Sequence, residues 1–115
     1  MAVSPGYAEF VRDVLAGFAA VAVRPMFGGA GVYHEGVMFG LVADEVLYLR
    51  GDQTTAADFA AHGKGPFVYQ AKGRKPVAMP YFEVPEHLYD DPDELARWAA
   101  RAHDIALREK PKRRK

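Results

Sequence analysis

The segment at residues 24–50 constrains the fold more than any other part of the chain, because it alternates short apolar runs with turn residues. Glycines crowd positions 28–31, and the pairs Glu35-Gly36 and Asp44-Glu45 separate the runs that follow. Apolar runs of roughly four to eight residues between such turn signals are typical of antiparallel strands joined as hairpins. The segment is therefore predicted to form the middle of an antiparallel sheet.

Strands are predicted at residues 21–27, 31–34, 37–43, 46–50, 67–71 and 76–84. The run at 37–43 is apolar on both faces, which indicates a central strand that is covered on both sides. Pro25 predicts that the first strand bends or lies at an edge, since proline has no N–H to donate to a neighbouring strand. Pro80 predicts an irregular last strand near an edge for the same reason.

Two helices are predicted before the last strands. The first starts at Ser4-Pro5, where the serine caps free amides and the proline suits the first helical position. The second is short, is capped by Asp52 or Thr55, and ends at Gly63. Apolar residues recur with helical spacing in the first helix, at Tyr7, Phe10, Val11, Val14, Leu15 and Phe18.

A third helix is predicted to start at Asp91-Pro92, with Glu94 completing a capping-box pattern. Asp93–Arg97 and Asp104–Arg108 are expected to pair along its outer face. The elements together predict a single α+β domain over residues 1–109. Its antiparallel sheet has five to six strands, and the N-terminal, middle and C-terminal helices pack on it.

Composition limits the chemistry that the chain can carry. It has no cysteine, which excludes disulfides and thiolate sites, and Ser4 is its only serine and is placed as a cap. The glycines at 28–31 precede a strand rather than a helix, which argues against a phosphate-binding loop. His87, Asp90 and Asp91 approach a set of metal ligands, but Asp91 is better explained as a cap. No catalytic, cofactor-binding or metal-binding residue is predicted.

Charge is unevenly distributed along the chain. The sequence has 15 basic and 15 acidic residues. Residues 1–109 hold 10 of the basic and all 15 of the acidic residues, a net charge of −5, and the last six residues hold the other five basic ones. Residues 110–115 are predicted to form a disordered basic tail. The sequence lacks a signal peptide and a run of the roughly 18 apolar residues that crosses a membrane, so a cytoplasmic protein is expected.

Direct nucleic-acid binding is one function that the residues leave open. Lys72, Arg74 and Lys75 occupy a predicted hairpin tip between Tyr69 and Tyr81, and aromatic side chains on a sheet can stack on bases. The acidic body is a poor general docking surface for phosphates, which favours weak, salt-sensitive binding by the tail alone. The tail residues of this alternative are Lys112, Arg113, Arg114 and Lys115.

Several motifs resemble the TfoX (Sxy) N-terminal domain family across about residues 4–108. They are PMFGGAGVY at 25–33, GVMFGLVA at 36–43, LYLR at 47–50, PFVY at 66–69 and KPVAMPYFEVP at 75–85, with the helix around Trp98. The resemblance implies an antiparallel sheet with helices packed on it, similar to secretion-chaperone-like domains. It implies no catalytic residues. Full-length members append a helical C-terminal domain, which is expected to be absent here.

The resemblance also implies a role in transcription. Proteins with this domain include regulators of natural competence, which are thought to help the cAMP receptor protein recruit polymerase. A non-enzymatic protein-interaction domain, a transcription accessory of this type, is therefore expected, as a monomer or a homodimer. Its candidate contacts are Phe27, Gly28, Gly29 and Tyr33, with the tip and the tail. A small-molecule-binding domain or an enzyme at the glycine turn is the third hypothesis.

Overall fold

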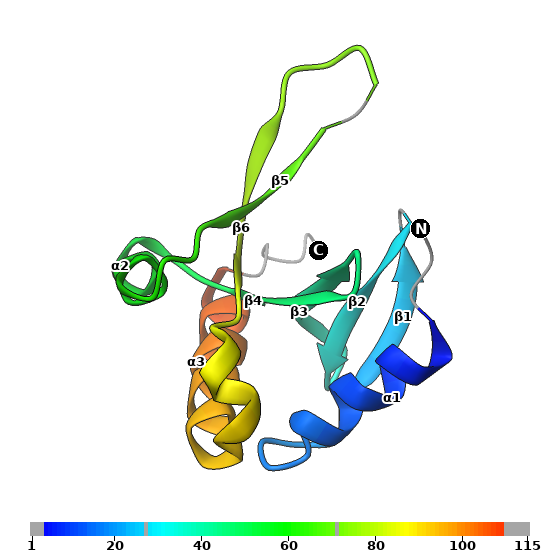
Figure 1. Ribbon diagram of the computed structural model, residues 1–115, viewed down its shortest axis with the longest axis vertical. Helices are drawn as coiled ribbons and strands as arrows, with labels where there is room; N and C mark the ends of the chain where they lie inside the picture. The colour runs from blue at the N-terminus through cyan, green and yellow to red at the C-terminus, as the bar shows by residue number, and fades with distance from the viewer. Residues whose placement is uncertain (1–3, 27, 71, 110–115) are drawn as a thin grey trace, which may run out of the picture.

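A computed structural model describes residues 4–26, 28–70 and 72–109, which form one α+β domain (Figure 1). Its six strands form one antiparallel sheet in the order β1-β2-β3-β4-β6-β5. The predicted fold class is confirmed. The elements in chain order are α1 Pro5–Val14, β1 Ala22–Met26, β2 Gly29–His34, β3 Val37–Ala43, β4 Val46–Arg50, α2 Gln53–Ala61, β5 Pro66–Tyr69, β6 Val77–Glu83, the 3-10 helix η1 Glu86–Asp90 and α3 Pro92–Glu109.

Four strands differ from their predicted bounds: β1 and β6 are one residue shorter at each end, and β2 and β5 differ more. β2 starts at Gly29 rather than Gly31, because the glycines after the first turn residue already pair with β1. β5 ends at Tyr69, and position 71 lies outside the described residues. The strand that contains Pro25 is an edge strand, as predicted. Pro80 falls where β6 leaves β4, since the pairing of these two strands runs only from Tyr81 to Glu83 in β6.

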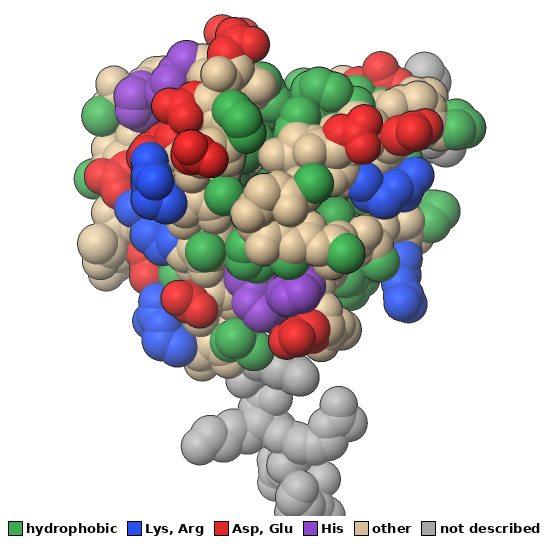
Figure 2. All heavy atoms as spheres, turned by 90° about the horizontal axis from the view of Figure 1, so that it is seen from below, with side chains coloured by type: hydrophobic (Ala, Val, Ile, Leu, Met, Phe, Trp, Pro, Cys, Tyr) green, Lys and Arg blue, Asp and Glu red, His purple; other side chains and the backbone are tan. Residues whose placement is uncertain are grey.

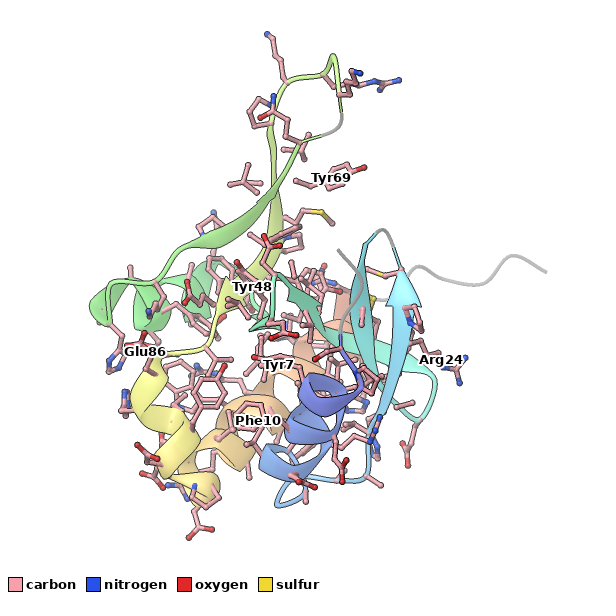
Figure 3. All side chains as sticks on the ribbon, turned by 45° about the vertical axis from the view of Figure 1, so that its right-hand side comes forward. Tyr7, Phe10, Arg24, Tyr48, Tyr69 and Glu86 are labelled. Atoms are coloured by element: carbon pink, nitrogen blue, oxygen red, sulfur yellow. The ribbon has the colours of Figure 1, made fainter. Side chains whose placement is uncertain are left out.

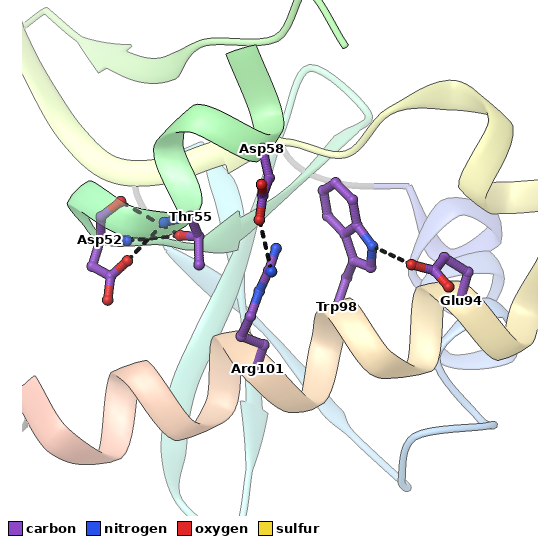
Figure 4. Close-up of polar contacts among 6 residues, drawn as sticks. All are labelled: Asp52, Thr55, Asp58, Glu94, Trp98 and Arg101. Carbon is purple, nitrogen blue, oxygen red and sulfur yellow. Dashed lines mark hydrogen bonds and ion pairs between the residues drawn. The ribbon is translucent and has the colours of Figure 1, made fainter. Parts of the chain in front are cut away.

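The predicted capping residues are confirmed, but the capping box at Glu94 is wrong, because the Glu94 carboxylate bonds Arg97 and Trp98 instead of the Asp91 N–H. The Tyr7 N–H donates to the Ser4 hydroxyl at 3.1 Å, and the Glu94 N–H donates to the Asp91 carboxylate at 3.2 Å. Asp52 and Thr55 act together rather than as alternatives, because each side chain bonds the backbone N–H of the other at 2.9 Å (Figure 4). Such reciprocal caps satisfy amides that have no partner inside the helix.

The charged face of α3 pairs differently from the prediction. Arg97 bonds Glu94 rather than Asp93, and Arg108 reaches Asp52 at 3.5 Å rather than Asp104. Arg101 lies 2.8 Å from Asp58 and connects α3 to α2 (Figure 4). The surface of the molecule seen from below carries interspersed acidic and basic side chains (Figure 2).

A bulge in β3 divides its side chains between the two faces of the sheet. Val32 pairs with Gly40 and Tyr33 with Met38, so Phe39 is the extra residue. Phe39 points to the helices, where its ring lies 5.4 Å from that of Phe18. Beyond the bulge Val42 joins the same buried cluster, whereas Leu41 is buried outside that cluster. The prediction of a strand covered on both faces is confirmed.

The helices cover one face of the sheet (Figure 1). α3 packs on β3 and β4, and α1 packs on β1. α2 joins this layer through Phe59, whose ring stacks on Phe82 at 5.2 Å and meets Trp98 edge-on at 5.0 Å. The fully buried side chains of this core include Val11, Leu15, Val32, Phe39, Leu47, Leu49, Phe59, Leu88 and Leu95.

Gly29 is required by close approach of two strands. It is buried at the start of β2, and a Cβ at this position would overlap the carbonyl oxygen of Val42 in β3. Both partners are backbone, so neither can move without disturbing the sheet. Gly65, by contrast, has open space where its Cβ would lie.

Gly29→Ala is expected to lower the free energy of unfolding by about 2 kcal/mol, since overpacking of this size typically costs ~1–3 kcal/mol. Gly65→Ala is the matched control and is expected to change it by less than about 0.5 kcal/mol or to raise it slightly. Urea unfolding followed by Trp98 fluorescence measures both. Equal effects of the two substitutions would contradict the close approach.

Candidate functional site

The face of the sheet opposite the helices carries a row of aromatic, sulfur and cationic side chains. The Arg24 guanidinium lies 5.4 Å from the centre of the Tyr33 ring. A Cβ on Gly31 would touch both Tyr33 and Met38, so these two side chains lie together over the glycine. Tyr48 meets Phe67 edge-on, with 5.2 Å between ring centres. This face is filled by its own side chains.

Arg50 and Tyr81 form the central pair of this face. The Arg50 guanidinium carbon lies 5.7 Å from the centre of the Tyr81 ring. Within the described part of the chain, the Arg50 Nε is buried without a hydrogen-bond partner, and Arg50 forms no ion pair. Burial raises the pKa of the Tyr81 phenol, and the Arg50 charge acts in the opposite direction. Tyr81 is only 7 % exposed, so the prediction that it offers a ring for stacking is wrong.

A groove of about 570 Å³ opens at one end of this face. It is bounded by the end of β1, the β1–β2 turn, the β3–β4 turn and β5. Its lining is mainly apolar, and Asp44 is its only carboxylate among the described lining residues. The lining residues are Met26, Gly28, Gly29, Ala30, Leu41, Val42, Ala43, Asp44, Phe67, Val68, Tyr69, Gln70 and Met79.

The β5–β6 hairpin projects from the body of the domain as an arm (Figures 1 and 3). Among the described residues, Val77 and Ala78 of β6 pair with β5 alone. The arm exposes large apolar side chains, with Val68 at 52 %, Val77 at 57 % and Tyr69 at 41 %. Figure 3 shows Tyr69 high on the arm, away from Tyr48 at its base. A two-stranded ribbon of this kind has no core of its own.

The tip of the arm carries the predicted basic residues. Lys72, Arg74 and Lys75 are all exposed, and no carboxylate of the described chain lies within 4 Å of them. The Gln70 side-chain amide donates to the Arg74 carbonyl at 3.1 Å and fixes the base of the tip. The tip therefore presents three cations to solvent.

The other predicted contact residues are only partly brought together. Gly28 and Gly29 line the groove, and Gly28 has the positive φ of 77° that a turn glycine adopts. Tyr33 lies half-buried under Arg24 and does not line the groove. Phe27 and the tail residues Lys112, Arg113, Arg114 and Lys115 lie outside the described residues.

The exposed apolar side chains of the arm were not among the predicted contact residues. The sequence indicates their exposure, because Val68 and Val77 lie within four residues of the charged segment KGRK at 72–75. In the described ranges, no group of three or more histidine, aspartate or glutamate side chains is placed to hold a metal ion. None of the helices described here has the length and apolar character needed to cross a membrane.

Residues 13–106 match the family model described as the TfoX N-terminal domain. The chain belongs to the TfoX N-terminal domain family. It is 29 % identical over 102 residues to Protein Sxy of Escherichia coli (strain K12), which covers 89 % of this chain and 48 % of that protein. It is 38 % identical over 72 residues to DNA transformation protein TfoX1 of Aliivibrio fischeri (strain ATCC 700601 / ES114), which covers 63 % of this chain and 34 % of that protein. The chain thus spans about half or less of the length of these relatives.

The match places the groove and the arm within the TfoX N-terminal domain itself, since residues 26–79 lie inside the matched range. The described groove lining holds Asp44, Tyr69 and Gln70 beside its apolar residues and contains no histidine or lysine.

Arg50→Met is expected to raise the pKa of Tyr81, because it removes the positive charge that favours the phenolate. Arg24→Met, which removes the cation over Tyr33, is the matched control and is expected to leave the pKa of Tyr81 unchanged. Tyrosine-specific ¹³C NMR titration is the measurement, since burial also raises the pKa of Tyr48 and of Tyr89.

The sign of the effect on stability follows from the same shift. An unfolded tyrosine releases its proton near pH 10, whereas the folded Tyr81 holds it to higher pH. The free energy of unfolding therefore falls as the pH rises through about 10, and it falls further in Arg50→Met. A titration midpoint of Tyr81 that is unchanged or lower in Arg50→Met would contradict the interaction between Arg50 and Tyr81.

Proposed function

We propose that this TfoX N-terminal domain is a non-enzymatic protein-interaction domain that serves as a transcription accessory protein of the competence-regulator type. The observation that carries the proposal is the projecting arm with its exposed apolar side chains beside an apolar groove. The names of two relatives, Protein Sxy and DNA transformation protein TfoX1, support a role connected with competence.

The arm supports protein binding on energetic grounds. Val68 and Val77 leave about half of their side-chain surface in water. Covering an exposed valine side chain contributes roughly 1.5 kcal/mol, and exposed apolar patches on small domains commonly mark interaction sites. Any ordering of this two-stranded ribbon on binding costs conformational entropy, which the newly buried apolar surface must exceed.

The partner is expected in the transcription machinery. By family resemblance it is RNA polymerase or the cAMP receptor protein, with this domain acting as a coactivator between them. The acidic body, with a net charge of −5 over residues 1–109, would not compete with either protein for promoter DNA. The interaction is therefore proposed to run through protein surfaces.

A pull-down from the protein's own host is the direct test. Tagged protein is incubated with lysate with and without nuclease, and bound proteins are identified by mass spectrometry. Polymerase subunits or the cAMP receptor protein are expected to remain bound after nuclease treatment and to be absent from an unfolded bait. Their absence from the folded bait would contradict the proposed role.

Direct nucleic-acid binding remains a second candidate because the arm tip presents three unpaired cations among the described residues. Nucleic-acid binding differs from the proposed protein binding in how strongly its affinity depends on salt concentration. Each phosphate contact made by lysine or arginine contributes about one unit to the slope of log affinity against log salt concentration.

The double substitution Arg74→Ala with Lys75→Ala is expected to lower this slope by about two units if the tip contacts phosphates. Fluorescence anisotropy with a labelled DNA duplex measures it. Arg12→Ala, which removes an exposed cation from α1, serves as the control. A slope that changes only when residues 112–115 are removed would exclude the arm from the contact.

A further inference from the structure

We propose that the groove binds a short extended segment of a partner protein, in which apolar side chains are followed by carboxylates, by adding it as a strand to the edge of β5. This inference rests on the proposed protein-interaction function and names the surface and the chemistry of the partner. Three observations carry it: the strand edges that border the groove, its apolar lining and the cationic tip beyond it.

The edge of β5 faces the groove. Successive side chains of a strand point to opposite faces, yet four consecutive residues at 67–70 all line the groove. Such a lining places the backbone edge of β5, rather than one of its faces, along the opening. β5 is the last strand of the sheet, so this edge has no neighbouring strand within the described chain.

The opposite border is formed by the other end of the sheet. Met26 ends β1, the first strand in the sheet order, and Gly28 and Gly29 follow it along the groove. The end of β1, the β1–β2 turn and the β3–β4 turn thus lie across the groove from β5. A strand is the natural occupant of such a space, because main-chain hydrogen bonds to an open edge supply affinity for an extended peptide.

The lining selects apolar side chains for this strand. Met26, Leu41, Phe67 and Met79 supply flexible thioether and hydrocarbon surface. Methionine-rich walls adapt to differently shaped apolar groups. A volume of about 570 Å³ lies in the range of small binding pockets, roughly 300–1,000 Å³. It suits a few side chains of a short segment rather than a folded domain.

The charges set the chemistry at the end of the segment. β5 leads from the groove into the tip, where Lys72, Arg74 and Lys75 have no acidic partner in the described chain. A segment whose carboxylates lie against this tip gains charge complementarity, which contributes to specificity and to the rate of association. Asp44 at the β3–β4 turn disfavours a second set of carboxylates at that side of the groove.

The test is a selection from a random peptide library displayed on phage, with the whole chain as bait. Enriched peptides are expected to share alternating apolar residues with aspartate or glutamate at one end. A synthetic copy of an enriched peptide is then measured by fluorescence anisotropy. Val68→Asp and, separately, Arg74→Glu are each expected to weaken its binding by about tenfold or more.

Two controls separate the site from general effects. Leu107→Asp alters an equally exposed apolar side chain on α3, since Leu107 is 48 % exposed, and should leave binding unchanged. Methylation of alternate backbone amides of the peptide should abolish binding if the peptide pairs as a strand. Val68→Asp is checked for an unchanged unfolding midpoint, and Arg74→Glu at the exposed tip provides an independent readout.

Several outcomes would overturn the inference. These are no enrichment, enrichment of basic peptides, binding that survives Val68→Asp and Arg74→Glu, and binding that survives amide methylation. A dimer in sedimentation equilibrium that dissociates in Val68→Asp would assign the groove to a second copy of the chain. Competition of the peptide by duplex DNA at the wild-type tip, with no effect of Val68→Asp, would assign the tip to nucleic acid.

Failure of this inference is distinguishable from failure of the proposed function. If Val68→Asp captures polymerase subunits or the cAMP receptor protein as well as the wild type does, the groove is not the contact and the function stands. If the peptide binds as expected but neither protein is captured, the groove binds a segment of another partner and the transcription role fails.

Discussion

The bulge at Phe39 is the constraint on which the rest of the structure depends. A regular strand of this sequence would send Phe39 and Leu41 to the same face and leave Val42 on the other. The extra residue instead gives Phe39 and Val42 to the helix core and turns Leu41 toward the groove. One apolar strand thereby contributes side chains to the helix core and to the groove. A bulge also increases the local twist of the sheet.

This division explains why the two faces differ in character. The helices α1, α2 and α3 complete the core on one face, so the other face closes with its own side chains, among them Tyr33, Arg50 and Tyr81. In the arm this face has no such cover, because β6 no longer pairs with β4 there and pairs only with β5. Exposed valines, an open strand edge and unpaired cations meet there. The buried core lies in the helix-covered half, and the binding role is proposed for the arm.

Local sequence signals predicted most of the fold but little of the site. Caps such as Asp91 and turns such as Glu35-Gly36 depend on neighbouring residues, and the structure confirms them, with positive φ at both turn positions. The bulge could not be predicted, because an entirely apolar strand has no alternation that reveals a change of face. The pairing of Arg108 with Asp52 depends on how α2 meets α3, which local spacing does not contain. The basic tip was identified from the sequence, whereas the groove depends on how β5 lies relative to the β1–β2 and β3–β4 turns, which local patterns do not contain.

The central claim is that this domain meets its partner through the arm and groove rather than through the helix layer. The most direct measurement places a photo-crosslinking amino acid at position 68, and in a second protein at position 107, and irradiates living host cells. Both positions are about half exposed, so they sample the arm and the helix layer equally. The account predicts a protein adduct from position 68 and none from position 107. Adducts from position 107 alone would contradict it and assign the contact to α3.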